Sequence, residues 1–119
     1  MSEHYEQSEL FRLTRDRKEL RWMFAIPNGG MRNKATAANL RREGVKAGVA
    51  DIFVPIPSYG YHGLFIEMKF GKNKLTPEQR EFFDYATQQG YCYKVAYSAE
   101  VAIEVIDEYL GLNDDKSTD

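Results

Sequence analysis

Two short apolar stretches of this 119-residue chain contain charged residues that could do chemistry together. In the run 65–70, Glu67 and Lys69 lie two positions apart, so on a β-strand their side chains point to the same face. Three apolar residues of this run point to the opposite face: Ile66, Met68 and Phe70. A second apolar run, 49–54, contains a single acid, Asp51. The three charged residues are therefore candidates for one polar site between two buried strands.

Buried carboxylates beside a lysine would each cost several kcal/mol unless they are paired or bind a metal. Asp51 and Glu67, on neighbouring strands, could converge on Mg²⁺, which prefers oxygen ligands and is usually held by one or two carboxylates, waters and substrate phosphate. Lys69 could position or deprotonate a water and offset the charge of a phosphorane-like transition state. This set favours phosphodiester hydrolysis. Without a metal, Glu67 and Lys69 would form only a solvated ion pair worth about 0 to 1 kcal/mol.

The charge distribution indicates a polyanionic partner, although the net charge is −2. Between residues 12 and 46 there are ten Lys or Arg and three acids, whereas the chain beyond residue 99 is acidic. We expect the N-terminal half to form a basic surface that steers a polyanion toward one side of the molecule. The expected DNA contacts lie around the turn at 28–30, before the Asp51 strand and just after Lys69: Asn28, Arg32, Lys34, Arg41, Arg42, Lys46, Lys72 and Lys74. The alternative is a charged helix face, because Arg12, Arg15, Lys18 and Arg21 recur every three residues.

The hydrophobic pattern predicts a single α/β domain with a mixed central sheet flanked by helices. The expected elements are a helix at 3–19, a strand at 22–26, a helix at 34–43, a hairpin of the runs 49–54 and 65–70, a helix from 77 to Gly90, a strand at 91–97 and a helix from Ser98 to Gly111. A frayed acidic tail is expected at 112–119.

Local signals define the two C-terminal helices. Thr76 is expected as an N-cap, with Pro77 in the first turn, and Gln79 could close a capping box. This capping role is an alternative to any role of Gln79 in the site. The last helix should place its apolar residues inward: Val101, Val105, Ile106, Tyr109 and Leu110.

The sequence also argues against a membrane or secreted protein and against cysteine-based sites. No apolar run approaches the roughly 20 residues that cross a bilayer, and no secretory signal pattern is present, so we expect an intracellular protein without a membrane partner. Cys92 is the only cysteine, which excludes an internal disulfide and a multi-cysteine zinc site.

The spacing of these residues resembles the PD-(D/E)XK nuclease superfamily, through the motif 48–51, Glu67-Met68-Lys69 and Gln79. The wider pattern resembles its virus-type replication-repair nuclease (VRR-NUC) branch. That pattern consists of Ile26-Pro27-Asn28-Gly29-Gly30, Gly44-Val45-Lys46-Ala47-Gly48, Gly63-Leu64-Phe65-Ile66-Glu67, Leu75-Thr76-Pro77-Glu78-Gln79 and Gly90-Tyr91. The chain departs from the superfamily motif at Ala50, where proline would stand.

The resemblance implies a restriction-endonuclease-like core over residues 1–111. It assigns Asp51, Glu67 and the Met68 carbonyl as metal ligands, Lys69 as the catalytic lysine, and Gln79 as a residue near the metal and DNA backbone. Family members also carry a first-helix glutamate four residues before a glutamine. Here that spacing fits Glu3 with Gln7, while Glu6 and Glu9 are the alternatives.

The resemblance implies a Mg²⁺- or Mn²⁺-dependent, structure-selective DNA endonuclease that acts in a bacterial or phage-infected host cell. Stand-alone members of the branch are similar to Holliday junction resolvases, which suggests a homodimer that cuts branched DNA such as a four-way junction. A symmetric dimer would also supply the two active sites that cutting two strands requires. The alternative is a catalytically silent DNA-binding or adaptor module on the same scaffold.

Overall fold

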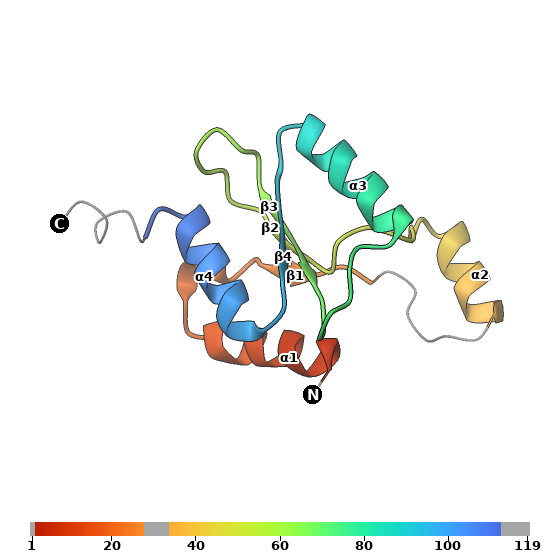
Figure 1. Ribbon diagram of the computed structural model, residues 1–119, viewed down its shortest axis with the longest axis horizontal. Helices are drawn as coiled ribbons and strands as arrows, with labels where there is room; N and C mark the ends of the chain where they lie inside the picture. Colours follow the sequence, from red (N-terminus) through yellow and green to blue (C-terminus); the bar gives the residue numbers. More distant parts are fainter. Residues whose placement is uncertain (1, 28–33, 113–119) are drawn as a thin grey trace.

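The computed structural model describes residues 2–27 and 34–112, with only the backbone of Lys34 included (Figure 1). Asn28, Arg32 and the predicted tail beyond Leu112 lie outside the described residues. The elements in chain order are α1 (Glu3–Thr14), a short 3₁₀ turn η1 (Lys18–Leu20), β1 (Phe24–Ala25), α2 (Lys34–Arg42), β2 (Ile52–Val54), β3 (Leu64–Met68), α3 (Pro77–Gln88), β4 (Cys92–Ala96) and α4 (Ala99–Tyr109).

The four strands form one mixed sheet in the order β1-β2-β3-β4. β2 and β3 form the predicted antiparallel hairpin, with Ile52 opposite Ile66, whereas β4 runs parallel to β3 with Val95 beside Glu67. β1 adds an antiparallel edge next to β2. The predicted fold class is therefore confirmed, and β3 lies between a strand on each side.

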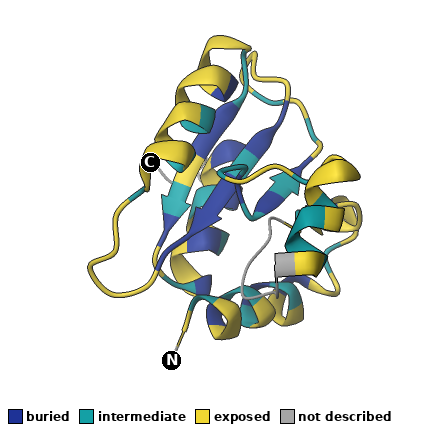
Figure 2. Cartoon of the chain, turned by 90° about the vertical axis from the view of Figure 1, so that its right-hand side faces the viewer, coloured by how far each residue is buried: buried dark blue, intermediate teal, exposed yellow. Residues whose placement is uncertain are grey.

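Helices cover both faces of the sheet (Figure 1). Leu64, Ile66 and Met68 alternate onto the face covered by α1 and α4, where they join a buried core with Leu10 and Ile106. The alternate residue Phe65 points to the opposite face, where its ring packs edge-on against Phe82 of α3 with centroids 5.0 Å apart. Figure 2 shows the buried strands between helices whose outer surfaces are exposed.

A buried acid joins the two helices on the first face. The Glu6 side chain of α1 accepts a 2.9 Å hydrogen bond from the backbone N–H of Ala99, in the first turn of α4. Ser98 caps the same helix end, because its side chain accepts from Val101 N–H. Because a carboxylate at a helix N-terminus satisfies an otherwise free donor and the helix dipole, Glu6 fixes α1 against α4.

Four sequence predictions are wrong in detail. The first helix stops at Thr14 instead of residue 19, because the chain turns there so that Leu20 and Met23 reach the core. The strand predicted at 22–26 contains only two residues, both exposed, at the sheet edge. Val101 is exposed on α4, where Ala99 and Ala102 take the inward positions, and Phe70 lies beyond the end of β3 and is also exposed.

The segment before β2 packs tightly on the first turn of α3. Gly48 has φ +89°, and a Cβ at this position would lie 2.6 Å from the carbonyl oxygen of Glu78. Only glycine allows both this backbone conformation and this contact. Since Asp51 follows Gly48 and Gln79 follows Glu78, the contact sets the position of the Asp51 strand relative to α3.

We therefore expect Gly48→Ala to destabilise the protein through two effects. Gly44→Ala is the matched control, because Gly44 has φ +103° but a Cβ added there would have no atom within 4 Å. The control should lose about 1 to 2 kcal/mol of unfolding free energy from backbone strain alone, and Gly48→Ala should lose about 1 to 3 kcal/mol more from the clash. Urea unfolding of both variants measures the difference. Equal losses would contradict the packing role of Gly48.

Candidate active site

The sheet register brings the two predicted carboxylates together. One step beyond the Ile52–Ile66 pair, Asp51 lies opposite Glu67, and both side chains point to the face covered by α3. The Asp51 backbone carbonyl accepts from Ile26 N–H at 2.7 Å, and its carboxylate accepts from Met68 N–H at 2.8 Å. Asp51 is thus fixed at both its backbone and its side chain.

Glu67 is almost completely buried, with 2% of its surface exposed. Its Oε2 accepts from Gln79 Nε2 at 3.2 Å, while its Oε1 is buried and has no hydrogen-bond partner among the described residues. Burial, followed by the nearby charge of Asp51, raises the pKa of Glu67 to about 9. Lys69 opposes this shift. Two carboxylates this close need a compensating positive charge to be ionised together.

Lys69 is held by a short network that starts at the beginning of α3. Its Nζ donates to Gln79 Oε1 at 2.6 Å and lies 3.9 Å from Glu67 Oε2. The same Gln79 oxygen accepts from Thr76 N–H at 2.9 Å, and Thr76 Oγ1 accepts from Gln79 N–H at 3.2 Å. The predicted capping box is confirmed. Gln79 caps its helix and also contacts both Glu67 and Lys69, so its capping role does not exclude a role in the site.

The three first-helix acids have different surroundings. Glu3 lies in the first turn of α1, close enough for its charge to help raise the pKa of Glu67. Glu6 is occupied with the Ala99 N–H. Glu9 forms an ion pair with Arg12 at 2.8 Å on the outer surface of α1. These contacts favour Glu3 as the first-helix residue of the site.

The donor set fits a hard divalent cation. Asp51 and Glu67 supply two carboxylates, one with a buried oxygen that lacks a partner, and a positive ion would relieve their mutual repulsion. Within residues 2–27 and 34–112, no group of three His, Cys, Asp or Glu side chains could hold a metal by itself. An ion here would complete its coordination with backbone oxygens, waters and substrate, as Mg²⁺ commonly does.

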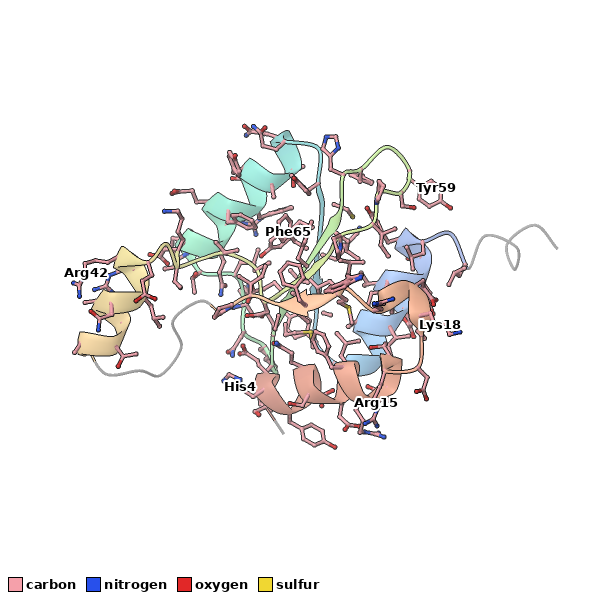
Figure 3. All side chains as sticks on the ribbon, turned by 180° about the vertical axis from the view of Figure 1, so that it is seen from behind. His4, Arg15, Lys18, Arg42, Tyr59 and Phe65 are labelled. Atoms are coloured by element: carbon pink, nitrogen blue, oxygen red, sulfur yellow. The ribbon has the colours of Figure 1, made fainter. Side chains whose placement is uncertain are left out.

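The basic residues do not form the single surface that the sequence predicts. Figure 3 shows Arg42 on α2 at one end of the molecule, and Arg15 and Lys18 near the opposite end. Around α1, Arg12 pairs with Glu9, and Arg17 pairs with Glu19 and Asp107. The sequence pattern failed here because the turn after Thr14 separates the two parts of the basic stretch.

The expected DNA contacts that the structure describes are on the exposed surface. Arg41 and Arg42 lie on α2, where Arg42 contacts Asn39, and Lys46 lies in the connection toward Asp51. Lys72 and Lys74 lie in the connection between β3 and α3. The first connection precedes Asp51 in the chain, and the second follows Glu67 and Lys69.

Sequence reasoning missed Tyr93 and Arg80 at this site. Tyr93 neighbours Phe65 in the parallel register and shares the face of Glu67. Burial raises the pKa of Tyr93, and the charges of Glu67 and Asp51 add to this effect while Arg80 opposes it. The alternation of β4 could have identified Tyr93 only if the strand order had been known.

Comparison with known proteins agrees with this geometry. A family model for the VRR-NUC domain matches residues 6–100. A solved structure described as a VRR_NUC domain protein has 30% sequence identity and a TM-score of 0.80, and the match covers 94% of this chain and 90% of that chain. No curated protein sequence gives a significant match.

The family match extends over most of the chain, and the similar structure shares both its fold and part of its sequence. The resemblance inferred from the motifs is therefore confirmed. The chain belongs to the VRR-NUC family, and is thus a nuclease of the PD-(D/E)XK type.

Proposed function

We propose that this protein is a metal-dependent endonuclease that cuts branched DNA, with Asp51, Glu67 and Lys69 as its central catalytic residues. The main support is the buried Glu67 oxygen without a partner, which lies beside Asp51 while Lys69 is held by Gln79. A stably folded protein that used this face only for binding would gain nothing from such a destabilising pair.

Asp51, Glu67 and the Met68 backbone carbonyl would hold the ion, either Mg²⁺ or Mn²⁺. When bound, such an ion polarises a phosphoryl oxygen and lowers the pKa of a coordinated water. Asp51 is already oriented for this role by the Met68 N–H. The carboxylates of this site thus need no large rearrangement.

Lys69 would place its ammonium beside the reacting phosphate and offset the negative charge of the transition state. Gln79 would keep Lys69 in position, since its side chain is itself fixed by the capping box. Glu3 would orient a water or a second ligand from the side of α1. Preorganised charges of this kind are effective because little reorganisation is required during the reaction.

Two features support branched DNA and a homodimer. A single small domain has one such site, so two symmetric copies would be needed to cut two strands. The exposed cations on α2 and on the connection after β3 lie on separate segments, which suits a substrate with more than one duplex arm.

Lys69→Ala should reduce cleavage in Mg²⁺ or Mn²⁺ by about a hundredfold or more, because the charge beside the phosphate is lost. Affinity for DNA, measured by fluorescence anisotropy, should stay nearly unchanged. Lys94→Ala is the control, since Lys94 is exposed on β4 outside this site. Cleavage that persists at the wild-type rate in Lys69→Ala would remove the assignment of Lys69.

Glu67→Gln should abolish Mn²⁺ binding measured by calorimetry and stabilise the metal-free protein. Folding raises the pKa of Glu67 from an ordinary value of 4.5 to about 9. Its contribution to stability is therefore complete below pH 4.5 and is lost as the pH rises through about 9. The advantage of the variant, of the order of 1 to 2 kcal/mol, should grow over this interval.

Urea unfolding with a chelator at several pH values tests this stability prediction. Glu81→Gln, on the exposed side of α3, serves as the control. Parallel pH profiles for wild type and Glu67→Gln would contradict it. Wild-type protein that binds no Mn²⁺ would favour the silent adaptor instead.

The substrate is tested with matched four-way junctions, flaps, splayed arms and plain duplexes. We expect branched substrates to be cut at least about tenfold faster than duplex, because two separated basic segments contact more than one arm. Analytical ultracentrifugation with the junction should give two protein chains per DNA. Equal rates on all substrates would reject the branched-DNA proposal and leave the nuclease class intact.

A further inference from the structure

A cavity of about 290 Å³ opens between α3 and β4, next to the catalytic centre. Its walls include two cations, Lys74 and Arg80, three aromatic rings, Phe83, Tyr93 and Tyr97, and the aliphatic side chains of Leu75 and Val95. Val95 is the register neighbour of Glu67, and Arg80 directly follows Gln79. Lys74 lies in the connection between Lys69 and the Thr76 cap. The cavity therefore borders the site through three separate elements.

We propose that this cavity binds the base of one unpaired nucleotide next to the phosphate that is cut. The inference rests on the proposed function, because it assigns a subsite of the same nuclease centre. Ligand pockets commonly measure about 300 to 1,000 Å³, so a volume of about 290 Å³ suits a single base and not a longer segment.

The aromatic walls suit the flat face of a base. Tyr97 is 43% exposed, so its ring is accessible, and its hydroxyl donates to the Asn73 carbonyl at 2.6 Å, which holds the ring in place. Phe83 and Tyr93 pack with centroids 4.8 Å apart and form a rigid neighbouring wall. Aromatic rings of this kind bind any base by stacking, independent of its sequence.

The polar groups suit the remainder of a nucleotide. Lys74 is exposed, and Arg80 lies over the Phe83 ring at 5.2 Å, so both cations are available to phosphates that flank the base. The Tyr93 residue is only 8% exposed, and its hydroxyl has no hydrogen-bond partner among the described residues. A buried hydroxyl without a partner is costly, and a polar base edge in the cavity would supply one.

Only an unpaired base can enter this cavity. In a duplex the two faces of each base are covered by its neighbours, and flipping one out costs a few kcal/mol. At a flap or splayed arm, bases next to the branch are already unpaired. The cavity would thus let the enzyme distinguish branched from plain DNA by a base contact, in addition to contacts with the backbone.

The test uses a splayed-arm DNA in which single nucleotides on each side of the cleavage position are replaced in turn by an abasic residue. At one of these positions, the abasic change should weaken cleavage by the wild-type protein about tenfold. The same change should have no effect on Tyr97→Leu, which lacks the ring. Tyr97→Phe keeps the ring and should respond like wild type.

Tyr59→Leu is the control variant, because Tyr59 is 62% exposed in a different cavity, beside Tyr61 and Tyr109. It should respond to the abasic residue like wild type. Equal cleavage of intact and abasic DNA by the wild-type protein at every position would overturn the inference, and this result does not depend on the folding of any variant.

Affinity measurements separate this inference from the proposed function. Anisotropy titrations of intact and abasic splayed arms with Lys69→Ala should show the same loss of about tenfold at the same position. If the wild-type protein cuts none of these DNAs but the difference in affinity persists, the endonuclease proposal fails and the base subsite stands. If DNA is cut and neither affinity nor rate depends on any base, the subsite is absent.

Discussion

The enforced proximity of Asp51 and Glu67 is the constraint on which the rest of this structure depends. The antiparallel register of β2 and β3 places the two acids opposite each other on a face that α3 covers, where Glu67 is buried and Asp51 is partly buried. Such a pair is unfavourable in the metal-free protein, as the pKa of about 9 for Glu67 indicates. The free energy that holds it together must come from packing elsewhere, mainly the core between the sheet and the helices α1 and α4.

Interactions at the N-termini of α3 and α4 hold the residues around Asp51 and Glu67 in position. Gln79 closes a capping box and, with the same side chain, contacts Glu67 and Lys69, so the start of α3 cannot shift without moving Lys69. The close contact between Gly48 and Glu78 joins the Asp51 strand to the same helix turn. On the other face, Glu6 caps α4 and thereby fixes the helix that carries Glu3. Local capping and active-site geometry are therefore parts of one arrangement.

The sequence predicts the features of this protein that depend on neighbours in the chain. Thr76, Pro77 and Gln79 define a helix start through contacts within three residues, and the alternation around Glu67 defines a strand face, so both predictions are confirmed. Features that depend on distant segments could not be predicted in this way. The partner of Glu6 is 93 residues away, and the position of Tyr93 near Glu67 requires the strand order. The basic stretch was misread because a turn, and not charge, decides where its two parts lie.

The position of β3 in the sheet has a consequence for how DNA would lie in the proposed complex. Glu67 is on an inner strand, with β2 and the connection to α2 on one side and β4 with its aromatic cavity on the other. The exposed cations of α2 and Lys46 suit a continuous backbone, which carries charge at every nucleotide. The cavity beside β4 suits an isolated base. A DNA strand that crosses Asp51 and Glu67 would then pass from a paired region to an unpaired one at the point of cleavage. Because paired DNA would lie on one side of the site and an unpaired base on the other, the enzyme would recognise the branch itself, without any contact that reads base sequence.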